Sequence, residues 1–125
     1  MKGLDTNVLV AWILSNADAP KLPDKGPFRV SYVALAELIW VFDKVYRRSR
    51  SEIAALVAML LKTEGVDFES AATVKAALDD FLEGPADFAD YLLMREGEAS
   101  GCETTLTYDR KAGRNGGFTL LKVGR

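Results

Sequence analysis

GLDTNVLV, the segment at residues 3–10, leads from an apolar start through one acidic residue into a second apolar run. We expect a buried strand over its first two residues that ends near Asp5. Thr6 or Asn7 can cap the helix that follows, because short polar side chains accept hydrogen bonds from the first N–H groups of a helix. The segment therefore predicts a strand that turns directly into a helix.

The same order of strand and helix recurs along the chain. Further strands are expected at residues 28–30, 66–68, 102–108 and 118–123. Further helices are expected at residues 33–45, 53–62, 70–82 and 87–100, with a loop at 16–27, a cap at Ser31 and a capping box of Ser49 and Glu52. This alternation predicts an α/β protein, with three α/β/α layers around a mainly parallel sheet and with residues 1–125 as a single domain.

Composition narrows the chemistry that this chain can perform. It has no histidine, so a histidine triad, a histidine-ligated zinc site and a histidine general base are excluded. Its one cysteine, Cys102, rules out an intrachain disulfide, and we expect it to be a small core residue. Without a signal-like segment or a long apolar run, a cytoplasmic location and no membrane role are expected.

Two of the candidate acids are expected where strands end. In parallel α/β sheets the reactive crevice lies beyond the carboxyl ends of the strands, a position that fits Asp5 and Asp109. Each has an ordinary alternative, since Asp5 can cap a helix and Asp109 can form a turn. Thr107 is expected to face the same side of its strand as Asp109, where its hydroxyl can orient a carboxylate or a water.

The other candidate acids lie on predicted helices. Glu37 is the one charged residue in VALAELIWVF, residues 33–42, and a helix so apolar is expected to be mostly buried. A carboxylate buried there needs a metal or a partner, unless Glu37 finds an exposed edge or pairs with an arginine. Asp87 and Asp90 share a helix face, with Asp87 also suited to be an N-cap and Asp90 expected to lie against the core.

Gathered together, these acids would repel one another unless cations neutralised them. An all-oxygen cluster without histidine selects Mg²⁺ or Mn²⁺ over zinc. Such sites are suited to phosphoryl chemistry, because the metal binds phosphate and activates water. The joint pattern therefore predicts a metal-dependent enzyme that acts on phosphate esters.

Four stretches of the sequence resemble PIN domains, especially the VapC-type toxins of type II toxin–antitoxin pairs. They are residues 3–10, the segment AEL at 36–38, the segment ADFADYLL at 86–93, and residues 101–112. The matches span nearly the whole chain in the family's order. The helix at 91–96 departs from the family, being bulkier and more charged than its usual small-residue helix.

The resemblance implies a PIN fold, an endoribonuclease that cleaves RNA phosphodiester bonds with Mg²⁺ or Mn²⁺, a cognate antitoxin and a homodimer. By position, Asp5 and Asp90 would be the principal metal ligands, and Glu37 and Asp109 would complete the site. Asp87 would be an additional acid. The residues that would orient ligands or water are Thr6, Asn7 and Thr107.

Other readings stay open. The chain could be a PIN-like module that binds RNA or protein without catalysis. An aspartyl-phosphate phosphatase is less favoured, because that chemistry requires an acid at the position that Asn7 occupies.

Two groups of basic residues are either solvated surface or RNA contacts. The first is Lys44, Arg47, Arg48 and Arg50, and the second is Arg110, Lys111 and Arg114. Trp12, Trp40 and Phe42 are expected in the core or at a subunit contact and not as base-stacking platforms, and Asp79, Asp80 and Glu83 are expected on a solvated helix face.

Overall fold

The computed structural model describes residues 1–15 and 26–122. By its internal contacts the chain divides into two compact units, Met1–Ala71 (unit 1) and Ala72–Arg125 (unit 2), and each is described by itself. The loop expected at residues 16–27 lies mostly outside the described residues. So does Val123, the end of the last expected strand.

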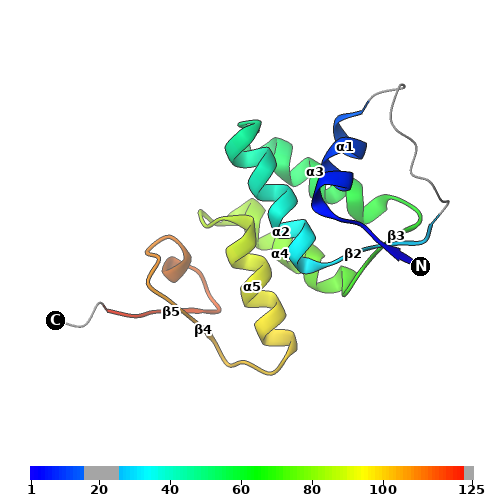
Figure 1. Ribbon diagram of the computed structural model, residues 1–125. Coiled ribbons are helices and arrows are strands. Elements are labelled where there is room, and N and C mark those ends of the chain that lie inside the picture. Colours follow the sequence, from blue (N-terminus) through cyan, green and yellow to red (C-terminus); the bar gives the residue numbers. More distant parts are fainter. Residues whose placement is uncertain (16–25, 123–125) are drawn as a thin grey trace. The chain divides into compact units, whose positions relative to one another are not determined.

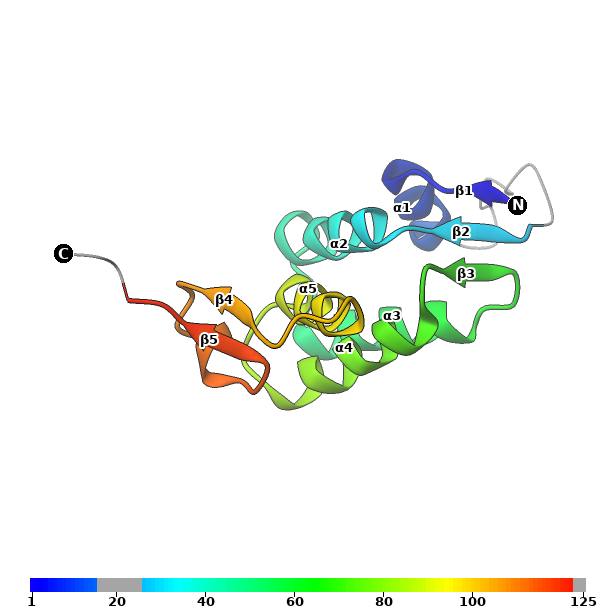
Figure 2. The same ribbon diagram turned by 90° about the horizontal axis from the view of Figure 1, so that it is seen from below.

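Unit 1 contains three short parallel strands in the order β1-β2-β3 (Figure 2). Lys2 of β1 lies beside Phe28 of β2, which in turn lies beside Val66 of β3. The elements in chain order are β1 (Lys2–Gly3), α1 (Thr6–Leu14), β2 (Phe28–Val30), α2 (Tyr32–Trp40), a π-helical turn η1 (Val41–Val45), α3 (Arg50–Lys62) and β3 (Val66–Phe68) (Figure 1).

The predicted caps of helices α2 and α3 are confirmed, although α3 begins at Arg50, three residues before its predicted start. Ser31 caps α2, its hydroxyl accepting a hydrogen bond of 3.1 Å from the N–H of Ala34. Ser49 and Glu52 form the expected capping box, in which each side chain accepts a hydrogen bond from the other residue's N–H. These caps satisfy donors that the helix itself leaves unpaired, so they fix where each helix begins.

Unit 2 joins two helices to a pair of parallel strands, β4 and β5. Its elements are α4 (Ala71–Glu83), α5 (Phe88–Ala99), β4 (Thr105–Thr107), a 3-10 turn η2 (Ala112–Arg114) and β5 (Phe118–Leu120). Gly101, at φ +95°, follows the end of α5, as expected for a residue without a Cβ. Both helices lie within about a residue of their predicted bounds.

Each unit has an apolar core of its own. Leu9, Leu35, Leu38 and Val57 are fully buried in unit 1. The buried side chains of unit 2 include Val74, Phe88, Tyr91 and Met94, and Phe88 packs edge-on against Phe81 with ring centroids 5.9 Å apart. The expected mixed α/β character is therefore confirmed, with parallel strands in small sheets. Within the described residues no helix combines the length and apolar character that crossing a membrane requires.

Three sequence expectations about β1, β4 and Cys102 are wrong. Strand β1 is exposed, not buried, because it is only two residues long and is an outermost strand of its sheet. The strand expected at 102–108 is confined to Thr105–Thr107, since pairing with the three-residue β5 limits its length. Cys102 consequently precedes the strand and is exposed.

Candidate carboxylate site

Asp5 is exposed and caps helix α1, so the alternative role considered for it is present. Its Oδ1 accepts a hydrogen bond of 2.7 Å from the N–H of Thr6. The expectation that Thr6 or Asn7 caps this helix is wrong, because Asp5 already has the extended backbone of an N-cap (φ −77°, ψ 154°). The cap holds Oδ1 in place, and Oδ2 accepts no hydrogen bond from the described residues.

Glu37 is exposed, so the burial expected for its carboxylate is wrong, although most of its helix is buried or half-buried. Val33, Glu37 and Trp40 recur at helical spacing and together form an exposed stripe along α2, while Leu35 and Leu38 are buried. Glu37 therefore lies on an exposed edge of its helix, which was the alternative to burial considered from the sequence. An exposed carboxylate does not by itself require a metal.

Thr6 connects Glu37 to the Asp5 turn. The hydroxyl of Thr6 donates a hydrogen bond of 3.0 Å to Oε2 of Glu37, across 31 residues of sequence. Because Thr6 also donates its N–H to Asp5, one residue orients both carboxylates. Unit 1 thus brings together Asp5, Thr6 and Glu37, while Asn7 is exposed beside them and its side chain has no hydrogen bond to a described residue.

Asp90 is half-buried in the first turn of helix α5, as expected for an acid against the core. Burial raises the pKa of its carboxyl above the ordinary value, and the negative charges of Asp87 and Asp109 raise this pKa further. A hydrogen bond from the backbone of Asp87 works in the opposite direction. Asp87 itself is the exposed N-cap residue of α5, although its side chain makes no capping hydrogen bond.

Asp109 is exposed and follows strand β4 by two residues. Its Oδ1 accepts hydrogen bonds from the N–H groups of Lys111 (2.8 Å) and Ala112 (3.3 Å), so the turn-forming role is present. The hydroxyl oxygen of Thr107 accepts a hydrogen bond of 3.0 Å from the N–H of Asp109. Thr107 therefore positions Asp109 through the backbone, not through the carboxylate as expected.

The predicted site residues form two sets, one in each unit. Unit 2 brings Asp87, Asp90 and Asp109 close enough for their charges to interact. Electrostatic repulsion acts over a longer range than coordination, however, and nowhere in residues 1–15 and 26–122 do three potential ligands lie close enough to hold one ion. The oxygen-only chemistry and mutual repulsion of the unit 2 acids fit a hard divalent cation.

A polar pocket of about 430 Å³ in unit 2 went unpredicted. On its wall the Tyr91 hydroxyl accepts a hydrogen bond from the N–H of Ala86 and donates one of 3.0 Å to Asn115. The pocket also contains Asp80, which pairs bidentately with Arg95 at 2.6 and 2.8 Å, a contact that raises the pKa of Arg95. The expectation that Asp80 lies on a solvated face is therefore wrong.

These contacts leave little trace in the sequence. Asp80 and Arg95 lie on different helices, so no helical spacing relates them. Gly84 gives a partial signal, because a Cβ there would collide with the Tyr91 hydroxyl. Only the tertiary structure shows that approach.

No protein-family model matches the chain, and no curated protein and no solved structure matches it either.

Proposed function

We propose that this chain is a Mg²⁺- or Mn²⁺-dependent endoribonuclease of the PIN type. The observation that carries the proposal is the setting of Asp90. Its carboxyl is half-buried beside two other acids, and no described lysine or arginine forms an ion pair with it. Divalent cations would relieve this repulsion, and the resemblance of four sequence stretches to PIN domains supports the same chemistry.

The hydrogen bonds of the acids support this role. Asp5 and Asp109 each use Oδ1 to accept backbone N–H groups, which fixes the carboxylate and leaves Oδ2 for another ligand. The hydroxyl of Thr6 fixes the Glu37 carboxylate in the same way, by donating a hydrogen bond to Oε2 of Glu37. When bound, the metal would supply charge neutralisation and activation of a water for attack on the RNA phosphodiester.

We propose further that the fold is the three-layer PIN arrangement with one mainly parallel central sheet. Asp5 follows β1 and Asp109 follows β4, and each of these strands is outermost in its own parallel sheet. Strands of a single sheet would carry both acids at their carboxyl ends, where α/β proteins bind ligands.

Cleavage of RNA tests the enzymatic proposal. Purified protein is incubated with total cellular RNA in Mn²⁺, in Mg²⁺ and in EDTA, and the cut ends are mapped. We expect endonucleolytic cuts that EDTA abolishes and that Asp5→Asn and Asp90→Asn each abolish. Asp67→Asn is the control, since Asp67 is an exposed acid of β3 outside the proposed site.

The alternatives give different results in the same samples. Binding of RNA without cutting would support a non-catalytic module. Hydrolysis of small phosphate monoesters would support an aspartyl-phosphate phosphatase. Cutting that persists unchanged in EDTA would reject the metal mechanism.

Thermal unfolding tests whether the acids of each unit bind a divalent cation. A ligand that binds only the folded state stabilises it by about 2.7 kcal/mol at a hundredfold excess over Kd. We expect Mn²⁺ to raise the Tm of the wild type. Asp5→Asn in unit 1 and Asp90→Asn in unit 2 should each reduce this rise, whereas an unchanged rise in either variant would show that its acid does not bind the ion.

The resemblance also supports a role as the toxin of a type II toxin–antitoxin pair. In that case a cytoplasmic antitoxin would cover the acids, presenting an arginine to them, and the toxin would form a homodimer. Expression should arrest growth, and a neighbouring small gene should relieve the arrest. Normal growth on expression would remove the toxin role and leave the nuclease proposal in place.

A further inference from the structure

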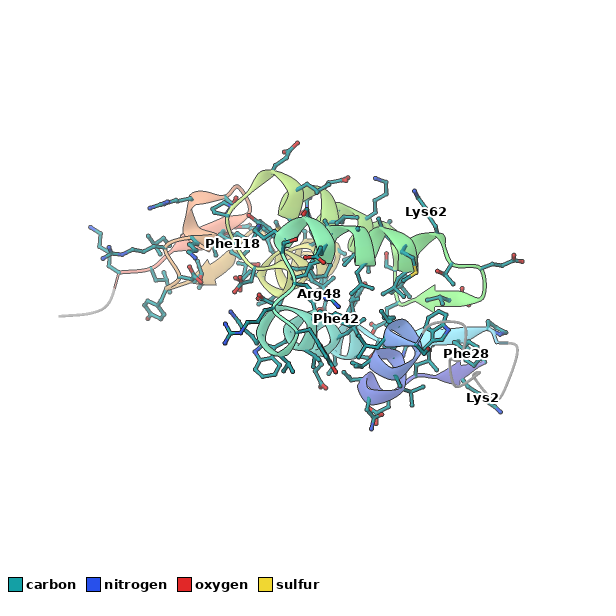
Figure 3. The ribbon with its side chains drawn as sticks, turned by 90° about the horizontal axis from the view of Figure 1, so that it is seen from above. Lys2, Phe28, Phe42, Arg48, Lys62 and Phe118 are labelled. Carbon is teal, nitrogen blue, oxygen red and sulfur yellow. The ribbon has the colours of Figure 1, made fainter. Side chains whose placement is uncertain are left out.

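Tyr91 is a buried tyrosine directly beside the acids of unit 2. It follows Asp90 on helix α5, and it is 1% exposed. Its hydroxyl accepts a hydrogen bond of 3.1 Å from the N–H of Ala86 and donates one of 3.0 Å to Oδ1 of Asn115. Its ring packs edge-on against Phe118 of β5, with centroids 6.3 Å apart at 68° (Figure 3). Contacts at both the ring and the hydroxyl therefore fix the orientation of this side chain.

The Asn115 side chain extends this contact to the turn that follows β4. Its Nδ2 donates hydrogen bonds to the carbonyl oxygens of Lys111 (2.9 Å) and Ala112 (3.3 Å). The N–H groups of the same two residues donate to Oδ1 of Asp109. One side-chain amide thus holds the two residues whose backbone holds the Asp109 carboxylate.

The neighbours of the Asn115 amide fix its orientation. Its oxygen accepts the Tyr91 proton, and its nitrogen faces two carbonyl oxygens. Turning the amide over would set its oxygen against those carbonyl oxygens, which cannot donate a hydrogen bond. The observed orientation is therefore the one that uses both the acceptor and the donors of the amide.

Gly84 leaves the space that the contact between Tyr91 and Asn115 occupies. A Cβ at this position would collide with both the Tyr91 hydroxyl and Oδ1 of Asn115. Any larger residue would push the two groups out of their hydrogen bond, because the tyrosine ring is packed on its own side. The absence of a side chain directly after α4 is thus a condition for this link between α5 and the turn.

We propose that Tyr91 and Asn115, here called the tyrosine–asparagine pair, are positioning residues that set the Asp109 carboxylate against Asp87 and Asp90. The inference rests on the proposed metal-dependent function. Asp90 directly precedes Tyr91 in the chain, and Asp87 directly follows the residue whose N–H donates to the Tyr91 hydroxyl. Asp109 is held through its turn by Asn115. The pair therefore joins the segments that carry all three acids of unit 2.

Neutral groups suit this task because of the charges that they bring together. The negative charges of Asp87 and Asp109 act on Asp90, so the turn and α5 repel each other at this place. An arginine between them would overcome the repulsion, but it would also occupy carboxylate oxygens that a divalent cation needs. The tyrosine–asparagine pair holds the turn through backbone carbonyl oxygens instead, and it adds no charge to the site.

Hydrogen exchange in EDTA tests the positioning without a metal. The amide protons of Lys111 and Ala112 report on the turn and are followed by NMR. Tyr91→Phe keeps the ring, and Asn115→Ala removes the amide. Each should speed exchange of the two protons about 2- to 13-fold, the range for the net loss of one hydrogen bond. Val74→Ala is the control, since it creates a cavity beneath α4 and removes no hydrogen-bonding group, and it should leave both rates unchanged.

Binding of Mn²⁺ and turnover connect the positioning to function. Loss of a residue that orients a metal's ligands costs about 10- to 100-fold in affinity or activity. We expect Tyr91→Phe and Asn115→Ala each to weaken Mn²⁺ binding about tenfold, measured by electron paramagnetic resonance, and to lower the kcat of RNA cleavage to a similar extent with KM unchanged. The double variant should be no worse than the weaker single variant, because both changes break the same series of contacts.

Two results would overturn the inference. In the first, exchange at Lys111 and Ala112 in both variants equals that in Val74→Ala. In the second, exchange rises, but Mn²⁺ affinity and kcat stay at the values of Val74→Ala, so that the pair serves the fold alone. If Asn115→Ala does not fold, Tyr91→Phe decides the test.

Failure of the proposed function gives a different result. A wild-type protein that neither binds Mn²⁺ nor cuts RNA would reject the nuclease. Faster exchange of the turn amides in Tyr91→Phe would in that case still show that the pair sets the position of Asp109.

Discussion

Replacing Asp90 by asparagine should stabilise the protein at neutral pH while abolishing its proposed activity. Asparagine has nearly the shape of aspartate and can still accept a hydrogen bond at Oδ1, so the change removes mainly the charge. That charge is half-buried and repelled by Asp87 and Asp109. A residue whose removal raises stability and destroys function is under functional constraint.

The expected gain follows from the competing contributions. A like-charge pair on one helix face destabilises by about 0.2–0.5 kcal/mol, and Asp109 adds a second repulsive charge. The positive end of the α5 dipole attracts the carboxylate by about 0.3–1 kcal/mol. Because the pKa of Asp90 is raised, burial and repulsion together exceed this attraction. We expect a small net gain of at most about 1 kcal/mol, or at most about 3–5 °C in Tm for a chain of this size.

The pH dependence gives the sign of the effect. Since the folded pKa lies above the ordinary aspartate value of 3.8, the folded state holds this proton more tightly than the unfolded state. The stability that the protonated carboxyl contributes is complete below about pH 3.8 and is lost as the pH rises through the folded pKa. The advantage of Asp90→Asn should therefore be largest at neutral pH and disappear near pH 3.8.

The assay is thermal or urea unfolding of both proteins in EDTA across this pH range. Asp79→Asn is the matched control, because it removes the same charge from an exposed acid of unit 2 that pairs with Lys75 at 3.4 Å. The control should lose about 0.3–0.5 kcal/mol. If Asp90→Asn is less stable than the wild type at neutral pH, or if its effect does not change with pH, the charge-crowding argument is wrong.

Three further changes test other contacts. Thr6→Val removes the hydroxyl that donates a hydrogen bond to Glu37 and should lower the kcat of RNA cleavage about tenfold, with a Tm close to that of the wild type. A large fall in Tm would mean that this contact is structural. Lys44→Gln with Arg47→Gln should reduce the slope of log K against log salt by about 1.4 for a single strand, measured by anisotropy, and an unchanged slope would contradict phosphate contact. Tyr91→Phe removes two hydrogen bonds and should cost about 1–3 kcal/mol in urea unfolding, and a cost near zero would show that these bonds are not needed.

Local signals in the sequence predicted the elements well, and long-range contacts account for the errors. Ser31, Ser49 and Glu52 set helix starts through neighbours at most three residues away, and these predictions are confirmed. The lengths of β1 and β4 depend on partner strands far along the chain, and the sequence overestimated both the burial of β1 and the extent of β4. Pairing of distant segments cannot be derived from local periodicity.

Glu37 shows where periodicity misleads for a different reason. An all-apolar surrounding indicated burial, but helix α2 exposes a stripe that contains Val33 and Trp40 as well as Glu37. Hydrophobic residues are not confined to the interior, so apolar neighbours in the sequence do not by themselves bury an acid. Glu37 is therefore placed by the side of the helix on which it falls and not by the polarity of its sequence neighbours.

For Asp5 and Asp109, a role in capping or turning the backbone is compatible with a role as a metal ligand. Each carboxylate caps or turns the backbone through Oδ1 alone. A capped carboxylate has lost rotational freedom, so its other oxygen can bind a cation with less loss of entropy than a free side chain. Capping geometry thus cannot count against a metal role. What distinguishes the two is the response to Mn²⁺, because an acid that only caps a helix gains no stability from the ion.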